Sequence, residues 1–539
     1  MDTDTWSRIV NMGESSFDWI DEIPVSLGPV VGHTTTTTSK IWVRARRTSD
    51  ALVLRYAPAF HGVTFDPVQG VFGPQQLAGP ITEVDLDPRQ GVFPYASVTL
   101  TGLCPDTRYF YEIVKADRER RHDAMALART PSFRTLPAGD PVLEAGGLRF
   151  AFFSCNGIHR RPSGQPATAM WRRLIAQTLS DEAIRFAVLG GDQVYADSVR
   201  DAWLADNHRS GELDEEQQEA LYQELVVQYG RIYMAWWRRP EIRTFMAHTP
   251  CVMMWDDHDI YDGWGSHGDE HLAPQQVFFR AAATAFDAHQ MPSNPDTNGK
   301  RRGHSHRAFH FRVGKAGFLV PDLRTTRRVN TSRVSALIGD EQWRYIDEVL
   351  DDFGAAGISH LFVVTSVPPI YADRWLSGVP QWMAGAEHDD LLDQWASRAN
   401  RNDQLRMFGT LLEFRRKHGC NVLFLGGDVH AACKGRLVSK NSEFLRDGER
   451  EAVLYEAVSS AIGYAPPQLL GGFGGWMMKQ HIEGEHVISP DYTGFIDESH
   501  FARNFSILGA EARKRAFRFQ LHVEGRDTPT VYYFTGPCD

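Results

Sequence analysis

The chain has 539 residues, which is longer than one hydrophobic core usually spans, so we expect two domains. Apolar residues make up 42% and charged residues 23%, the balance of an ordinary folded protein. The formal net charge of -11 argues against a protein that binds nucleic acid stably or coats an anionic membrane, because both need a basic face.

The start of the chain has no apolar core, no basic segment and no twin arginine, so no secretory signal is visible. No run of about 18 apolar residues occurs, and no membrane span is expected. The six cysteines show no pair spacing. We therefore expect a reduced, cytoplasmic protein, or a secreted one if a leader has been removed. The sequence does not indicate an oligomeric state.

Residues 20–137 have an all-β pattern. Lys40–Ala45 alternates as a half-buried strand does, and Ala51–Tyr56 is a second candidate strand. The run Leu103–Tyr111 resembles the corner before a late strand of fibronectin type III and immunoglobulin-like sandwiches, where a tyrosine hydroxyl ties the corner to nearby backbone. We expect an immunoglobulin-like β-sandwich, followed by a linker at 137–141.

From residue 148 onward, short apolar runs alternate with helical stretches, a pattern typical of strands buried on both faces in an α/β fold. The runs are Arg149–Phe153, Phe186–Leu189, Cys251–Trp255, Phe318–Val320, Leu361–Val364 and Val422–Leu425. Glu215–Met246 is expected to be an inserted helical pair. The late runs, expected to complete a second sheet together, are Val453–Ser460, Arg518–Val523 and Thr530–Phe534.

Four of the predicted strands end in residues that bind hard cations. The endings are Ser-Cys-Asn at 154–156, Gly-Asp-Gln-Val-Tyr at 191–195, Asp-Asp-His-Asp at 256–259 and Gly-Asp-Val-His at 427–430. Sites in α/β folds form where the carboxyl ends of several strands converge. So many carboxylates in one cleft would repel each other or desolvate badly without cations, and one carboxylate can bridge two cations about 3.5–4 Å apart. The sequence therefore predicts a metal site.

The order Gly-Asp-x-x-Tyr, Trp-Asp-Asp-His-Asp and Gly-Asp-Val-His, after a strand ending in Ser-Cys, resembles the PhoD-type alkaline phosphatases. That family belongs to the calcineurin-like metallophosphoesterases and is related to the purple acid phosphatases. The resemblance covers nearly the whole chain. It implies an α/β fold with a four-layer α/β/β/α metallophosphoesterase domain over 148–539, after the N-terminal sandwich. It also implies hydrolysis of small-molecule phosphoric esters with an alkaline optimum.

Two kinds of metal site follow from the resemblance. It implies an Fe(III) site, for which phenolate and thiolate are suitable anionic ligands, formed by Cys155, Asp192, Tyr195 and His430. It also implies a carboxylate-rich site for one or two Ca²⁺, formed by Asp192, Asp257 and Asp428 with Asp262 as a further candidate. The central histidine ligand of the wider superfamily has no clear match.

The resemblance also assigns a mechanism, in which a metal-bound hydroxide attacks phosphorus in line. His258 would contact the phosphoryl oxygens or protonate the leaving group. Arg324 lies in a run similar to the Asp-x-Arg turn of the family and would clamp a phosphate oxygen; a structural Arg–Asp pair is the alternative. Asp259 stands where the family more often has Glu, and its role is left open.

Two other functions remain open. A dedicated phosphodiesterase, acting on phospholipid headgroups or nucleotides, would carry the same motifs, since the discriminating contacts lie on loops. A non-catalytic scaffold that uses the β domain for adhesion would show degenerate motifs, whereas nearly every expected ligand is present here. Gly303–His306 imitates a Gly-His-x-His metal motif, but Gly-Asp-Val-His already fills that role, and we interpret the imitation as unrelated to the site.

Overall fold

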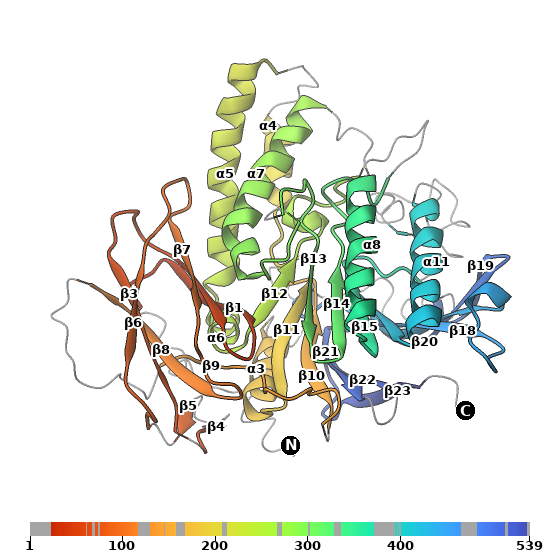
Figure 1. Ribbon diagram of the computed structural model, residues 1–539. Helices are drawn as coiled ribbons and strands as arrows, with labels where there is room; N and C mark the ends of the chain where they lie inside the picture. The colour runs from red at the N-terminus through yellow and green to blue at the C-terminus, as the bar shows by residue number, and fades with distance from the viewer. Residues whose placement is uncertain are drawn as a thin grey trace.

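The structure of the protein is a computed structural model (Figure 1). It describes residues 23–60, 62–66, 71–73, 76–116, 130–144, 146–157, 168–206, 213–266, 272–299, 302–327, 336–370, 394–395, 397, 400–464, 482–511 and 516–535.

The N-terminal part contains three sheets, which Figure 1 shows to one side of the molecule in red and orange. The first is antiparallel and consists of β1 (Leu27–Thr34), β2 (Ser39–Arg44) and β7 (Tyr95–Leu100). The second runs in the order β6 (Thr82–Leu86), β3 (Leu52–Pro58), β8 (Arg108–Lys115) and β9 (Ser132–Arg134). The third is the pair β4 (Thr64–Asp66) and β5 (Val71–Gly73).

The first two sheets contribute to one apolar core. Val31 and Ile41 of the three-stranded sheet belong to the same buried cluster as Leu54 of the four-stranded sheet. The corner predicted before β8 is also present, because the backbone N–H of Cys104 donates to the hydroxyl of Tyr109 at 2.8 Å. The tyrosine contact expected from the sequence is therefore confirmed.

The rest of the chain contains two larger sheets. The six-stranded sheet has the order β12 (Cys251–Met254), β11 (Ile184–Gly190), β10 (Leu148–Phe153), β21 (Asn504–Glu511), β22 (Ala516–Val523) and β23 (Thr530–Thr535). The eight-stranded sheet has the order β13 (Phe309–Val313), β14 (Ala316–Val320), β15 (His360–Thr365), β16 (Asn421–Gly426), β18 (Ala452–Ser459), β17 (Ala432–Ser439), β20 (Tyr492–His500) and β19 (Gly484–Ser489).

Helices cover both larger sheets (Figure 1). The α-helices are α3 (Ala169–Ser180), α4 (Asp197–Asp206), α5 (Glu215–Trp237), α6 (Pro240–His248), α7 (Ala273–His289), α8 (Asp340–Ala355) and α11 (Arg401–His418). The 3-10 helices among the described residues are η3 (Asp257–Asp259), η4 (Met291–Ser293) and η5 (Ser442–Phe444). The predicted helical pair is confirmed as α5 and α6. Among the described residues, no helix combines the length and the apolar character needed to cross a membrane.

The two larger sheets share a core of aromatic rings. Phe150 of β10 packs edge-on against Phe318 and Phe362 of the other sheet, with ring centroids 5.1 and 5.0 Å apart. Edge-to-face pairs of this kind stabilise a core beyond the area that they bury. This packing fixes the position of β10 relative to β14 and β15, and so relates the ends of strands in different sheets.

The six predicted apolar runs are all strands, namely β10, β11, β12, β14, β15 and β16. Within each sheet the relevant neighbours are parallel: β10, β11 and β12 in one, and β14, β15, β16 and β18 in the other. The prediction that the late runs complete one second sheet is wrong. β18 joins the eight-stranded sheet, whereas β22 and β23 extend the six-stranded sheet through β21.

Gly427 shows how closely the ends of the two sheets approach. A Cβ atom at this position would lie 2.7 Å from the carbonyl oxygen of Gly190 and 2.8 Å from that of Ser366. These contacts are too close for any side chain, so only glycine allows the end of β16 to meet the end of β11. Asp428 follows directly, and the carboxyl ends of both sheets therefore open onto one region.

A buried carboxyl group on β18 predicts a pH-dependent stability. Glu456 is fully buried, and burial raises its pKa from 4.5 to about 8. Between these values the unfolded chain loses the proton that the folded chain keeps, so the free energy of unfolding falls by up to about 1.4 kcal/mol per pH unit. Glu456→Gln removes this loss. The difference in the free energy of unfolding between the variant and the wild type, measured by urea denaturation, should therefore shift in favour of the variant from pH 5 to pH 8.

The control is Glu443→Gln, because the side chain of Glu443 is exposed. That substitution should change the free energy of unfolding equally at both pH values. An advantage of Glu456→Gln that does not vary with pH would contradict the assignment of a protonated carboxyl group to β18.

Candidate metal centre

The site lies at the carboxyl ends of β10, β11, β12 and β16, where four side-chain donors sit on unusual backbone. Cys155, Asp192, Asp428 and His430 have φ values of 56°, 54°, 59° and 50°. Residues other than glycine adopt such left-handed conformations rarely, at a cost of order 1–3 kcal/mol each. Four of them at adjacent strand ends indicate that the fold holds these side chains in place for a function.

The four residues expected to bind Fe(III) come together. Cys155, Asp192 and His430 place ligand atoms within 4.8 Å of one another. The Cys155 sulfur lies 3.5 Å from Oδ2 of Asp192, and the Tyr195 hydroxyl lies 3.3 Å from Nε2 of His430. Burial, followed by nearby negative groups, raises the pKa of both the Cys155 thiol and the Tyr195 phenol well above their usual ranges. A bound cation would offset this by favouring the thiolate and the phenolate.

A second cluster is rich in carboxylates. Asp192, Asp256, Asp257 and Asp428 form one group of donor atoms within 4.8 Å, and Asp192, Asp257 and His258 form another. Asp192 thus belongs to each of the groups, which is the position of a ligand shared between two cations. Burial, offset only in part by His258, raises the pKa of its carboxyl group well above the usual range.

An unsatisfied atom supports a cation at this position. Oδ1 of Asp192 is buried and has no hydrogen-bond partner among the described residues. An unpaired buried carboxylate oxygen is costly, and buried polar atoms of this kind are normally satisfied. The thiol, phenol, imidazole and carboxylate donors around Asp192 therefore fit a centre with two cations.

The candidate groups differ from the expected ligand set at two positions. Asp262 belongs to none of the three groups: its side chain is 62% exposed, and Oδ1 lies 3.8 Å from Nε2 of His258. It follows η3 in the chain, and its role as a ligand stays a prediction from the sequence. Asp256, which the sequence analysis left out, joins the carboxylate group instead. The doubled aspartate at 256–257 was the available signal.

Arg324 is placed differently from a phosphate clamp. Its side chain is completely buried; its Nε atom donates to Asp256, and Nη2 donates to Oδ1 of Asp257 at 3.1 Å. Its Nη1 atom donates to the carbonyl oxygen of Trp264 at 3.0 Å. These contacts correspond to the alternative, a structural Arg–Asp pair. Burial acts in the opposite direction, but Arg324, followed by His258 and the backbone N–H of Gly263, lowers the pKa of Asp257 to about 2.

His258 borders the carboxylates and is held on two sides. Its Nδ1 atom pairs with Oδ1 of Asp197 at 2.7 Å, and its ring stacks on Tyr195 with centroids 4.2 Å apart. Burial alone would lower its pKa, but Asp197, Asp257 and Asp192 together raise it well above 6.5. His258 therefore lies beside Asp192 with its Nδ1 atom engaged by Asp197, and the surrounding carboxylates favour its protonated form.

The sequence analysis missed a role for Tyr464. Its ring stacks on His430 at 3.8 Å and lies near Tyr195 at 5.7 Å, both nearly parallel. The backbone N–H of Tyr464 donates to the carbonyl oxygen of Cys155 at 3.2 Å. Tyr464 thus fixes the plane of the His430 ring. No local motif signals this contact, because it joins segments far apart in the chain.

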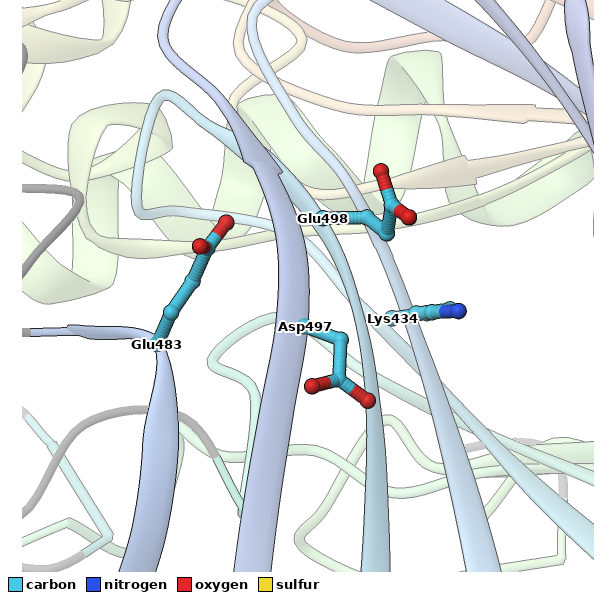
Figure 2. A pocket seen from close by; sticks show the side chains of 4 residues that line it. All are labelled: Lys434, Glu483, Asp497 and Glu498. Carbon is cyan, nitrogen blue, oxygen red and sulfur yellow. The ribbon is translucent and has the colours of Figure 1, made fainter.

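Two other polar features are separate from this centre. His304 pairs with Glu341 at 2.9 Å and stacks on His306, and neither histidine belongs to a cation group among the described residues. Figure 2 shows a surface hollow lined by Lys434, Glu483, Asp497 and Glu498. No residue of the metal centre lines it, and its acidic groups are not among the candidate cation groups of the described residues.

Comparisons with known proteins agree with this geometry. The family model for PhoD-like phosphatases matches residues 150–479, which is more than half of the chain and includes every residue of the three groups. The chain belongs to the PhoD-like phosphatase family. A solved structure of PhoD superposes with a TM-score of 0.60 at 16% identity, covering 95% of this chain and 90% of that one, and shows that the α/β fold is shared.

A curated relative is the uncharacterized protein YGR266W of Saccharomyces cerevisiae. It is 22% identical over 366 residues, which are 52% of this chain and 51% of the relative. The chain thus spans about half the length of the curated relative that it matches.

The position of Arg324 yields a prediction. Arg324→Ala leaves Asp256 and Asp257 buried without their counter-charge, so the free energy of unfolding should fall by about 3 kcal/mol or more. Chemical denaturation measures this loss, and Arg312→Ala, at an exposed arginine of β13, is the control. Unchanged stability combined with a raised KM for a phosphate ester would instead support the predicted role of Arg324 as a phosphate clamp.

Proposed function

We propose that this PhoD-like phosphatase hydrolyses phosphoric esters, monoesters, diesters or both, at alkaline pH. The observation that carries the proposal is the shared position of Asp192, which belongs to each candidate cation group, one of which includes His258. A cation pair next to a proton donor is an arrangement that favours in-line phosphoryl transfer to water.

The donor types support an assignment of metals. We assign Fe(III) to Cys155, Asp192, Tyr195 and His430, because a trivalent ion favours thiolate and phenolate ligands. We assign Ca²⁺, one ion or two, to the all-carboxylate group of Asp192, Asp256, Asp257 and Asp428. Bound there, the cations would lower the pKa of a coordinated water and neutralise charge on the phosphoryl oxygens.

The protein's own side chains perform the remaining steps. Oδ1 of Asp197 accepts a hydrogen bond from Nδ1–H of His258 and so orients the ring. The Nε2–H group of the ring then donates its proton to the departing ester oxygen. The carboxylates of Asp197, Asp257 and Asp192 raise the pKa of His258 above its ordinary value, which favours the form that carries this proton. Arg324 holds Asp256 and Asp257 in fixed positions.

We also propose the domain arrangement expected from the sequence. An immunoglobulin-like sandwich over 20–137 is supported by the core shared between the first two sheets and by the Tyr109 corner. A four-layer α/β/β/α domain over 148–539 is supported by the aromatic core between the larger sheets and by the helices that pack on them. A cytoplasmic location is part of the proposal and rests on the sequence.

The first test is hydrolysis of p-nitrophenyl phosphate and of bis(p-nitrophenyl) phosphate between pH 7 and 10. We expect turnover that a chelator abolishes and added Ca²⁺ restores, and about one iron per chain by elemental analysis. The faster ester distinguishes a phosphatase from a dedicated phosphodiesterase. Asp192→Asn should lose both metal and activity, whereas bound metal with full activity in that variant would refute the scheme. A protein with neither turnover nor metal would be a scaffold.

A second test addresses His258. His258→Gln should lower kcat by about 10²–10⁴-fold for phenyl phosphate, whose leaving group needs a proton. The loss should be much smaller for p-nitrophenyl phosphate, whose leaving group departs as a stable anion. Asp197→Asn changes the partner of Nδ1 and also the acceptor of the Asp262 backbone N–H, and it should lower kcat for phenyl phosphate less than His258→Gln does. Equal losses for both esters would exclude proton donation by His258.

A further inference from the structure

We propose that Asp259 and Gln290 form a positioning pair that fixes the backbone carrying the shared ligand Asp192. The inference rests on the proposed function, since it concerns the same centre. Asp259 is 2% exposed and appears in none of the candidate cation groups, so its carboxylate is available for another task.

The carboxylate of Asp259 accepts from backbone N–H groups on two strand ends. Its Oδ2 atom accepts from the N–H of Asp192 at 3.0 Å and from the N–H of Asp256 at 2.9 Å. A further backbone hydrogen bond comes from Val194. Asp192 follows β11 and Asp256 follows β12, so a single side chain joins the turns after two adjacent strands. Hydrogen bonds from N–H groups to a charged acceptor are stronger than neutral ones.

These bonds act where the backbone needs support. Asp192 has a φ of 54°, a conformation that persists only when surrounding contacts determine it. Gly191, directly before it, has a φ of 102° and leaves no space for a side chain, since a Cβ atom would lie 2.7 Å from that of Asp256. Asp259 therefore supports the one turn whose geometry sets the position of the shared ligand.

Gln290 holds the other oxygen of Asp259. Its Nε2 atom donates to Oδ1 of Asp259 and to the hydroxyl of Tyr233, both at 2.9 Å. Gln290 is completely buried, and the backbone N–H of this residue donates to Phe286 at the end of α7. With one oxygen engaged by backbone and the other by Gln290, the carboxylate of Asp259 has a single orientation.

The N-terminal sheets complete this support. Trp42 of β2 donates from Nε1 to the carbonyl oxygen of Ala288 at 2.9 Å, close to Gln290 in the chain. His289 stacks on Tyr233 with centroids 4.2 Å apart and lies 5.6 Å from the Trp42 ring. A continuous series of contacts therefore runs from β2 through the end of α7 to Asp259 and the turn of Asp192. Side chains that orient metal ligands typically change metal affinity or activity by 10–100-fold when they are removed.

The experiment compares Asp259→Asn, Asp259→Glu and Gln290→Met in the full chain. Gln275→Met is the matched control, because Gln275 is also a buried glutamine of α7 that bonds a tyrosine, here Tyr261 at 2.8 Å. Three quantities are measured: metal content as purified, the affinity of the stripped protein for Ca²⁺, and kcat and KM for p-nitrophenyl phosphate.

We expect Asp259→Asn, which places an amide against backbone donors, to weaken Ca²⁺ binding and to lower kcat by about 10–100-fold with little change in KM. Gln290→Met should show the same pattern more weakly, and Asp259→Glu should recover part of the loss because it keeps the carboxylate. Gln275→Met should leave metal content and kcat unchanged. A melting temperature reduced in Asp259→Asn with unchanged kcat and Ca²⁺ affinity would overturn the inference.

The outcomes separate this inference from the proposed function. If the wild-type protein binds Ca²⁺ but hydrolyses neither ester, the proposed function fails, while the Ca²⁺ affinities of the variants still decide the role of Asp259. If the wild-type protein is active and Asp259→Asn equals it in kcat and Ca²⁺ affinity, only the positioning role fails.

Discussion

The structure depends on the burial of several carboxylates at one point, with Asp192 at its centre. Asp192, Asp256 and Asp257 are each at most 4% exposed. Charges in such an environment persist only when they are paired and hydrogen-bonded. Among the described residues, the positively charged or basic side chains that act on these carboxylates include Arg324, which pairs with Asp256 and Asp257, Arg327 and His258. Asp192 keeps a carboxylate oxygen without a partner there, and a cation is the simplest means of balancing it.

This requirement explains the surrounding architecture. The two larger sheets pack through aromatic rings, and their parallel strands end on the same side. Donor side chains that follow β10, β11, β12 and β16 therefore meet there, and each segment supplies only a few of them. The residues with positive φ at these ends are tolerated because buried strands that pair with a neighbour on each side precede them. Gly427 permits the close approach that brings Asp428 to Asp192.

The N-terminal sheets pack against the helices that adjoin this site. They are not an independent appendage, because Trp42, Leu27 and Phe110 share one buried cluster with helices of the larger part. The hydroxyl of Tyr111 also donates to the carbonyl oxygen of Ala247 at the end of α6, at 2.7 Å. Trp42 likewise bonds the carbonyl oxygen of Ala288 near the end of α7. The N-terminal sheets therefore contact the ends of both helices.

The sequence alone determined many of the local elements and indicated most residues of the candidate cation groups. Apolar runs bounded by turn residues predicted six strands correctly, and the polar residues after them include Cys155, Asp192 and Asp428, which the structure places in these groups. Tertiary structure decided which neighbours these residues meet. It placed Asp256 inside the cluster and Asp262 in solvent, although both are aspartates of one short segment, and it sent β23 to the six-stranded sheet. Periodicity depends on adjacent residues, whereas a partner across the fold depends on packing that no local pattern contains.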